Sequence, residues 1–275
     1  MRSPISPISR RVATKAAAAL LAAAASSPLN AEPPPPAALA VVAGGFLIPS
    51  TQYQSYADAL ERLGCATLLY ADESTLSKPR LVTEGAGALL EQAEALARQR
   101  GVAPSAPLVL LGHSRGCKTC VAAAAQSRRR VAALVLLDPV DKTDPDPTTV
   151  LPTLGSLRVP TVLLGSGRSG FDCAPTNSNY ERFAESLSAA TPRLVGRLGS
   201  AGHTQFVDDR RALSVDVCTP GRVSDAAVRE VALATSEAWV RAALLDGASG
   251  SEQRVREVTR LQETQFAAGV EWSQT

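Results

Sequence analysis

The sequence predicts an α/β fold, with helices on both faces of a doubly wound and mostly parallel sheet. Short apolar runs alternate with helical patterns along most of the chain, and turns rich in glycine separate them. The apolar runs contain few polar residues, which is typical of strands that are buried on both faces. With 275 residues, of which 45% are hydrophobic and 20% charged, the chain can bury a large core as one domain.

The predicted strands are short apolar runs, and each run ends in a turn or a polar residue. They cover residues 37–43, 65–70, 108–111, 131–137, 161–164 and 194–198. The predicted helices repeat apolar residues at helical spacing, and glycine or a basic cluster ends several of them. They cover residues 53–64, 83–100, 118–127, 180–187 and 224–245. Residues 141–158 and 165–170 are predicted loops, and the tail after Gly250 is predicted to be a loosely docked helix or partly disordered.

The N-terminal segment differs in composition from the rest of the chain. Residues 1–31 contain four basic residues and no acidic residue, with an apolar run at 16–25. This composition predicts a chloroplast targeting peptide, with a secretory signal as the alternative. The expected organisation is therefore a targeting peptide (1–31), a proline-rich linker (32–37), a folded α/β domain (38–246) and a C-terminal tail (247–275).

Charge and cysteine content argue against several classes of function. Without residues 1–31 the chain has 24 basic and 26 acidic residues, so neither nucleic acid nor a polybasic membrane contact is expected. The five cysteines are odd in number and scattered, which argues against a disulfide scaffold. Cys117 and Cys120 lie on one predicted helix and are expected to pack there. With two histidines in the chain, no metal site and no cofactor are expected.

One motif predicts the chemistry. An apolar strand runs into Gly112-His113-Ser114-Arg115-Gly116, and an alanine-rich helix follows at once. Strand, Gly-x-Ser-x-Gly turn and helix in this order form the nucleophile elbow of α/β-hydrolases. The two glycines let the neighbouring backbone approach a sharply turned serine. Ser114 is therefore the predicted nucleophile, and the fold class narrows to the α/β-hydrolase fold.

A serine nucleophile needs a base and an acid. His113 precedes Ser114, so its side chain is expected to point away from the serine, and His203 is the predicted base by elimination. Asp138 and Asp172 are both candidate acids, because each follows a predicted strand. Position alone favours Asp172, since the acid in this fold more often follows the later strand.

The oxyanion hole and the substrate pocket are expected at the same edge of the sheet. The backbone N–H of Arg115 and that of Gly45 or Phe46 are the expected oxyanion donors. The Arg115 side chain either contacts substrate or caps the site. The aromatic residues Phe46, Phe171 and Tyr180 lie near this edge, where they either line an apolar pocket under the 141–158 and 168–180 loops or pack the loop bases.

Several segments together resemble the chlorophyllase family over residues 38–245. They are Gly-His-Ser114-Arg-Gly, Leu-Leu-Asp138-Pro-Val, Leu-Leu-Gly-Ser-Gly167 with Cys173-Ala-Pro175, and Ala-Gly-His203. The resemblance implies hydrolysis of the phytyl ester of chlorophyll, and it implies the triad Ser114, Asp138 and His203. It therefore moves the predicted acid to Asp138. An apolar ester, chlorophyll, is the implied substrate, and peripheral contact with a membrane is a further expectation.

The chain also departs from that family. It has Gly44-Gly45-Phe46 where members usually carry a His-Gly-aromatic turn, and it has little room for the additional N-terminal strands of plant members. An algal form, with a sheet lacking some N-terminal strands, would fit. A serine esterase, lipase or thioesterase of other specificity is the main alternative. A non-catalytic binding protein on the same fold is a third alternative, which the survival of the candidate serine, histidine and acids disfavours.

Overall fold

The computed structural model describes residues 34–71, 81–142, 146–168, 173–213 and 218–245, together with Arg256, Arg260 and 270–273. The predicted targeting peptide lies outside these residues, as do Phe171 and Asp172. None of the helices in the described part of the chain combines the length and apolar composition needed to cross a membrane.

Strands and helices alternate along the chain as the sequence predicts. The elements are β1 Ala38–Ala43, η1 Ser50–Tyr53, α2 Gln54–Arg62, β2 Cys65–Tyr70, α3 Val82–Gln99, β3 Leu108–His113, α4 Arg115–Gln126, β4 Val131–Leu137, α5 Leu151–Ser156, β5 Thr161–Ser166, α6 Tyr180–Ser186, β6 Arg193–Leu198, η2 His203–Phe206, η3 Arg210–Ala212, α7 Asp225–Leu244 and β7 Val270–Ser273. The strands form one sheet in the order β2-β1-β3-β4-β5-β6-β7, in which β1 to β6 are parallel and β7 is antiparallel to β6.

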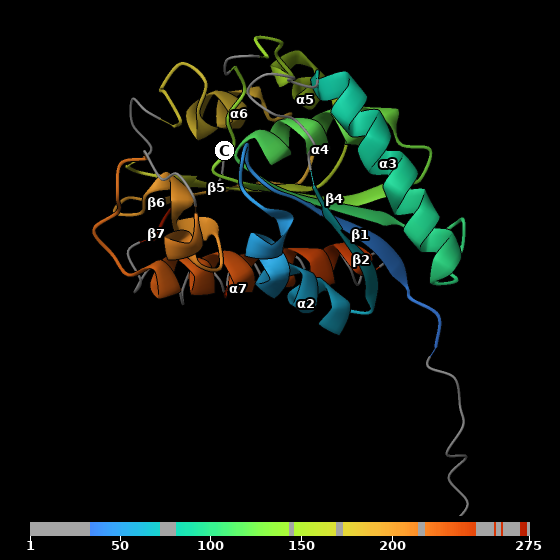
Figure 1. The fold of residues 1–275 in the computed structure, drawn as a ribbon. Coiled ribbons are helices and arrows are strands. Elements are labelled where there is room, and N and C mark those ends of the chain that lie inside the picture. Colours follow the sequence, from blue (N-terminus) through green and yellow to red (C-terminus); the bar gives the residue numbers. More distant parts are fainter. Residues whose placement is uncertain are drawn as a thin grey trace, which may run out of the picture. The chain divides into compact units, whose positions relative to one another are not determined.

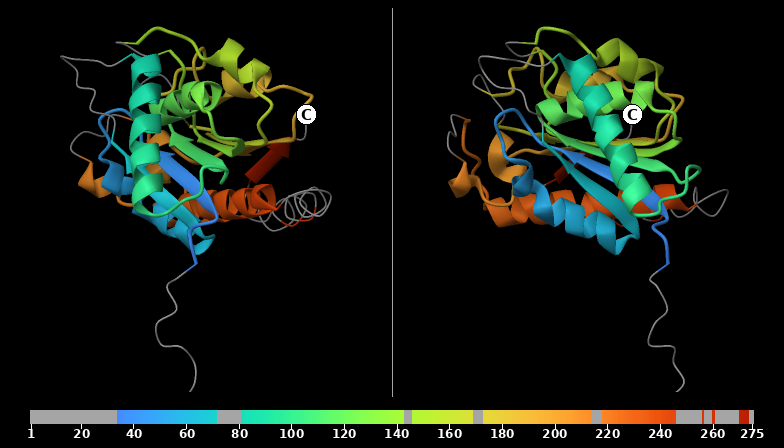
Figure 2. Two further views of the ribbon diagram at one scale, coloured as in Figure 1. Left: turned by 90° about the vertical axis from the view of Figure 1, so that its right-hand side faces the viewer. Right: turned by 45° about the vertical axis from the view of Figure 1, so that its right-hand side comes forward.

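Helices cover both faces of this sheet. Helices α3, α4, α5 and α6 lie over one face, and α2 and α7 lie over the other (Figures 1 and 2). Successive residues of a strand point to opposite faces, so each strand contributes to two cores. In β1, Leu39 and Val41 join the core under α3 and α4, whereas Ala40 and Val42 join the core above α2 and α7. Burial on both faces explains the uninterrupted apolar runs of the sequence.

The position of the site follows from the winding of the sheet. From β1 the chain passes to β2 on one side, and it then returns to place β3 on the other side of β1. Ligands of open α/β sheets bind at the carboxyl ends of the strands beside such a reversal. The carboxyl ends of β1 and β3 carry Gly44-Gly45-Phe46 and Ser114, respectively.

Two predicted segments differ in the structure. The tail, expected to be a helix or partly disordered, contributes β7, whose backbone pairs Val270 with Leu198 and Ser273 with Val195. A four-residue edge strand obtains its structure from this pairing, so its own sequence pattern does not reveal it. The predicted 141–158 loop contains the six-residue helix α5, which begins with a proline in its first turn. Proline suits that position because its missing N–H would have no acceptor within the helix.

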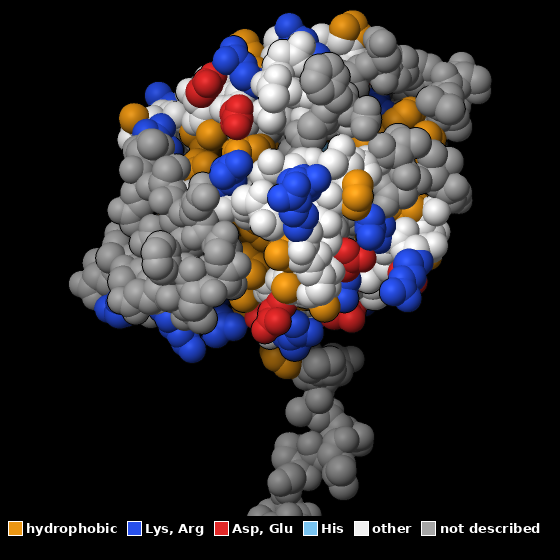
Figure 3. Space-filling model, turned by 90° about the vertical axis from the view of Figure 1, so that its left-hand side faces the viewer, with side chains coloured by type: hydrophobic (Ala, Val, Ile, Leu, Met, Phe, Trp, Pro, Cys, Tyr) orange, Lys and Arg blue, Asp and Glu red, His pale blue; other side chains and the backbone are white. Residues whose placement is uncertain are grey.

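Charged side chains of both signs are distributed over the described surface. On the face drawn in Figure 3, basic and acidic side chains lie interspersed among apolar ones. The ion pair between Lys118 and Asp146 is buried instead, with Lys118 Nζ of α4 3.1 Å from Asp146 Oδ2. It ties the chain between β4 and α5 to the helix that follows the elbow.

Candidate active site

Ser114 stands on a sharp turn between β3 and α4. Its backbone adopts φ 54° and ψ −125°, a conformation that is strained for a residue with a side chain. The Ser114 N–H donates to Leu137 O of β4 at 3.0 Å, and Ser114 O accepts from Cys117 N–H at 3.1 Å. These bonds to the neighbouring strand and to the first turn of α4 hold the serine in its strained conformation.

The two glycines of the elbow lie so close to neighbouring backbone that neither position has room for a side chain. A Cβ at Gly116 would lie 2.1 Å from Ala43 O of β1, and a Cβ at Gly112 would lie 2.5 Å from Cys117 N. Both contacts are with backbone atoms, which cannot move aside as a flexible side chain can. The motif therefore permits α4 to start directly against β1 and β3.

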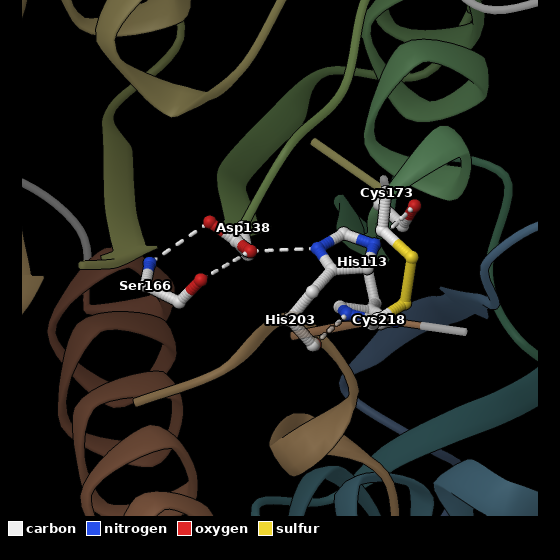
Figure 4. Close-up of a disulfide and its surroundings, with 7 residues drawn as sticks. His113, Asp138, Ser166, Cys173, His203 and Cys218 are labelled. Atoms are coloured by element: carbon white, nitrogen blue, oxygen red, sulfur yellow. Dashed lines mark hydrogen bonds and ion pairs between the residues drawn. A yellow bond between two sulfur atoms is a disulfide. The ribbon is translucent and has the colours of Figure 1, made fainter. Parts of the chain in front are cut away.

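Ser114, His203 and Asp138 form a hydrogen-bonded chain. The His203 Nε2 lies 2.9 Å from Ser114 Oγ. On the other side of the ring, His203 Nδ1 lies 2.6 Å from Asp138 Oδ2 (Figure 4). The three residues come from the ends of β3 and β4 and from the start of η2. Asp138 is fully buried and His203 nearly so, and Ser114 is 8% exposed. This is the arrangement in which an imidazole can take the proton of a serine hydroxyl.

Asp138 receives further hydrogen bonds from Ser166, at the end of β5. The Ser166 N–H donates to Asp138 Oδ1 at 2.8 Å, and its hydroxyl donates to Oδ2 at 2.7 Å (Figure 4). These donors fix the plane of the carboxylate against the imidazole. The sequence interpretation missed Ser166. Its place at the carboxyl end of the strand next to β4 is the signal that could have found it. The alternative acid, Asp172, lies outside the described residues.

His113 points away from Ser114, as the alternation of the strand predicts. Its Nδ1 lies 2.7 Å from the Tyr53 hydroxyl, and its Nε2 lies 3.0 Å from the backbone oxygen of His203. Its ring is fully buried, and burial, followed by the nearby His203, lowers the pKa of His113 to about 3. His113 is therefore neutral at ordinary pH and is not the residue that faces the serine.

The turn after β1 lies against the elbow. A Cβ at Gly45 would lie 3.1 Å from Ser114 Cβ. The Gly45 N–H donates to the Tyr53 hydroxyl at 2.9 Å, so this amide is already engaged. Of the two expected donors from this turn, Phe46 is therefore the one that the geometry favours. The Arg115 guanidinium lies over the Phe46 ring, 5.2 Å from its centroid, so this buried side chain packs on the turn.

Comparison with known proteins identifies the family. A family model described as chlorophyllase matches residues 89–265, a span that contains Ser114, Asp138 and His203. The chain belongs to the chlorophyllase family. It is accordingly a carboxylic ester hydrolase.

A solved esterase structure has a similar fold. The chain is similar to a ferulic acid esterase from Streptomyces cinnamoneus, with a TM-score of 0.50 and 21% identity, over 78% of this chain and 67% of that one. It is also similar to a structure reported for the metagenome-derived lipolytic enzymes LipS and LipT, with a TM-score of 0.48 and 16% identity, over 65% of this chain and 90% of that one. No curated protein matches the chain. The likeness to the esterase shows the α/β-hydrolase fold.

The chlorophyllase-family segment around Cys173 contains one disulfide, which the argument against a disulfide scaffold did not predict. Cys173 is bonded to Cys218, with their Cα atoms 5.4 Å apart (Figure 4). The bond joins the segment after β5 to the segment that precedes α7, and the 45-residue separation hides the pairing in the sequence. Cys65, Cys117 and Cys120 are free and buried, and burial raises the pKa of the Cys65 thiol to about 11.

Tyr180 is nearly buried among the described residues. It is 6% exposed and belongs to the core under α3 and α4, and a Cβ at Gly165 would lie 2.2 Å from its ring. Tyr180 therefore packs the base of the loop, and its contact with substrate stays a prediction. Phe171, the other predicted pocket residue of this segment, lies outside the described residues. Within the described ranges, no three His, Cys, Asp or Glu side chains gather closely enough to hold a metal ion.

Proposed function

We propose that this enzyme hydrolyses the phytyl ester of chlorophyll to chlorophyllide and phytol, with Ser114 as nucleophile, His203 as base and Asp138 as acid. The observation that carries the proposal is the series of hydrogen bonds from Ser114 Oγ through His203 to Asp138. This series occurs in a protein of the chlorophyllase family. Neither a cofactor nor a metal takes part in the proposed steps.

The first half of the proposed reaction forms an acyl-enzyme. Ser114 Oγ attacks the ester carbonyl carbon while its proton passes to His203 Nε2. The Asp138 carboxylate stabilises the imidazolium that results. The tetrahedral intermediate then collapses, the bond to the alcohol oxygen breaks, and His203 returns the proton to the departing phytol. The chlorophyllide acyl group remains on Ser114.

In the second half of the proposed reaction, water is the nucleophile and Ser114 Oγ is the leaving group. His203 takes a proton from a water molecule, whose oxygen attacks the acyl carbon, and the same proton returns to Ser114 Oγ as the acid leaves. In both halves the negative oxygen needs donors. The backbone N–H of Arg115, in the first turn of α4, and that of Phe46 are the proposed pair.

The surroundings of the serine support an apolar substrate. Phe46 is partly exposed beside the elbow, and the next residue, Leu47, is 57% exposed. An isoprenoid alcohol offers a long apolar chain for such a surface. Contact with a membrane surface, from which such a substrate would be drawn, stays a prediction.

The test compares two substrates and two variants. The purified protein is incubated with chlorophyll a and, separately, with p-nitrophenyl acetate, and chlorophyllide and p-nitrophenol are measured. Chlorophyll a should be turned over with the higher kcat/KM. Ser114→Ala and His203→Ala should each reduce both activities by about 10⁴-fold or more, with little further loss in the double variant, because a triad acts as a unit.

The outcomes separate the alternatives. Hydrolysis of p-nitrophenyl acetate without any release of chlorophyllide would assign a serine esterase of other specificity. Hydrolysis of neither ester by the folded protein would contradict the proposed function. Retention of a tenth of the activity by His203→Ala would contradict the assigned base.

A further inference from the structure

A chain of buried hydrogen bonds joins the oxyanion turn to the loop of the predicted base without passing through Ser114. Gly45 N lies 2.9 Å from the Tyr53 hydroxyl, which lies 2.7 Å from His113 Nδ1. On the other side of the ring, His113 Nε2 lies 3.0 Å from His203 O. These bonds thus connect the turn after β1, the end of η1, the end of β3 and the start of η2.

The direction of every bond in this chain is determined. A backbone oxygen can only accept, so His113 Nε2 carries a proton and donates to His203 O. Burial keeps the ring neutral, so Nδ1 has no proton and accepts from the Tyr53 hydroxyl. Burial also raises the pKa of the Tyr53 phenol, which stays protonated. Its oxygen accepts from the Gly45 N–H, because a backbone nitrogen can only donate.

The rings of this chain are closely packed and have no access to solvent. Both Tyr53 and His113 are fully buried. The His113 ring centroid lies 5.7 Å from that of Tyr53, 4.9 Å from that of His203 and 5.7 Å from that of Phe206. A Cβ at Gly44 would lie 2.6 Å from the Tyr53 ring, so the turn also rests on this ring. Neither end of the chain can shift without breaking a buried hydrogen bond.

We propose that Tyr53 and His113 are positioning residues for ester hydrolysis: they set the distance between the oxyanion turn and the catalytic histidine. The inference rests on the proposed function, because it assigns no new chemistry to the site. Tyr53 engages the Gly45 amide and thereby fixes the turn that presents the next amide, that of Phe46. His113 holds the backbone of His203, while Asp138 holds its ring at Nδ1.

The oxyanion turn and His203 must be correctly placed at the same time, because both act in the same step of the reaction. The proton must pass from Ser114 to His203 while the negative oxygen meets its donors on the other side of the carbonyl carbon. A displacement of about 1 Å at such a site can lower the rate about 10²-fold. The residue before the nucleophile is well placed for this task, because it moves with Ser114 as part of the same elbow.

The test uses variants that each remove different hydrogen bonds of this series. Tyr53→Phe keeps the ring and removes the hydroxyl. His113→Gln keeps a carboxamide N–H near the position of Nε2, whereas His113→Asn reaches only the position of Nδ1. Wild type and variants are assayed with p-nitrophenyl acetate, and active sites are counted by end-point labelling of the nucleophile with a fluorophosphonate.

The quantity measured is kcat per labelled site. We expect it to fall about tenfold in Tyr53→Phe and about 10²-fold in His113→Asn, with KM within about twofold of wild type, because a displaced catalytic group acts on turnover. His113→Gln should recover most of the loss seen in His113→Asn, since it can still donate to His203 O. Tyr70→Phe is the matched control: Tyr70 is equally buried, its hydroxyl donates to Gly85 O at 3.1 Å, and its kcat should be unchanged.

A merely structural role predicts a different result. The variants would then yield fewer labelled sites and a lower melting temperature, but an unchanged kcat per labelled site, and that outcome would overturn the proposal. Equal kcat values for His113→Gln and His113→Asn would overturn it as well. If wild type itself hydrolyses no ester and takes no label, it is the proposed function that fails rather than the positioning role.

Discussion

Asp138 combines a strained backbone with a fully satisfied carboxylate. Its φ is 41°, and its N–H donates to Leu164 O of β5 at 2.6 Å. A side chain at positive φ costs free energy, so the surrounding bonds must hold it there. Two donors of Ser166 and one of His203 converge on its carboxylate. Both Ser114 and Asp138 have strained backbones. At this site the backbone therefore places the side chains at a cost in stability.

We predict that Asp138→Asn lowers kcat by about 10⁴-fold, because the amide keeps the shape but loses the charge that stabilises the imidazolium and the correct tautomer. Asp172→Asn is the matched change and should cost less than about tenfold, since a carboxylate outside the triad acts only through a field that solvent screens. Both variants are assayed by ester hydrolysis at neutral and raised pH. A greater loss in Asp172→Asn would move the acid to the later loop.

His113 should make stability depend on pH. Its pKa is about 3 in the folded protein, against an ordinary value of 6.5, so the unfolded chain binds its proton more readily. The contribution of this group to stability is therefore complete above pH 6.5 and is lost as the pH falls toward 3. The slope contributed is up to about 1.4 kcal/mol per pH unit.

The measurement is urea unfolding of wild type and His113→Gln between pH 7 and pH 4.5. Carboxylates that titrate in this range affect both proteins equally, so the difference between the two curves isolates the histidine. The free energy of unfolding should fall more steeply for wild type as the pH is lowered. Parallel curves would mean that His113 is protonated in the folded protein.

At the scale of elements, the elbow is a contact between three backbones. The start of α4 meets the carboxyl ends of β1 and β3, and Gly116 lies in van der Waals contact with Ala43 and Gly44. A Cβ at this glycine would push α4 away from β1. That movement would displace Ser114 and the amide of Arg115 together, since both belong to the same turn.

We predict that Gly116→Ala removes nearly all esterase activity and lowers the melting temperature, because its new methyl group would lie 2.1 Å from a backbone oxygen. Gly87→Ala on α3 is the matched control, since no atom lies within 4 Å of its added Cβ. That change should raise stability by about 0.5–1 kcal/mol, as alanine replaces glycine within a helix. Thermal unfolding and the ester assay test both variants, and an active Gly116→Ala would contradict the packing.

Most elements could be predicted because their patterns are local. The strand predicted at 65–70 and that at 131–137 agree with β2 and β4 at both ends. The prediction for β3 ended two residues early, because Gly112 and His113 are not apolar although they continue the ladder to β4. Helix ends agree with the prediction to within three residues, and the differences lie where caps rather than periodicity decide.

The remaining features depend on partners far away in the chain. Ser166 is an ordinary strand residue until the register of the sheet places it beside Asp138. In the sequence, Tyr53 is one apolar residue of a helical repeat. That repeat does not reveal its hydrogen bonds to Gly45 and His113. The strand β7 exists because β6 offers it a free edge. Sequence periodicity reports burial, and it does not report which buried groups meet.

For the whole molecule, the sheet brings distant residues to one edge. Ser114 and His203 are 89 positions apart, and Asp138 and His203 are 65 apart, yet each pair shares a hydrogen bond. The segment that contains Cys218 supports the same edge. The side-chain amide of Gln205, in η2, donates to Val223 O at 2.8 Å, and a Cβ at Gly202 would lie 2.6 Å from Thr219 O. The disulfide thus anchors a segment on which the His203 turn rests.

The disulfide also bears on where the protein works. Disulfides form and persist in oxidising compartments such as the secretory pathway. The chloroplast stays the first sequence prediction for residues 1–31, and the Cys173–Cys218 bond favours the secretory alternative. A fluorescent fusion to residues 1–37, expressed in algal cells, would show which compartment the leader selects.

Reduction of the Cys173–Cys218 bond should lower the stability of the whole domain. The bond closes a segment of 45 residues, and the loss of this constraint on the unfolded chain is worth about 4 kcal/mol in the chain-entropy model. For a domain of this size, that corresponds to a fall in melting temperature of about 8–16 °C. Thermal unfolding with and without dithiothreitol measures it. The Cys173→Ser/Cys218→Ser double variant should melt at the temperature of the reduced wild type and should not respond to dithiothreitol. If the double variant melts at the temperature of the oxidised wild type, the bond contributes no stability, and hydrogen bonds such as those of Gln205 and Arg168 suffice to hold the segment before α7.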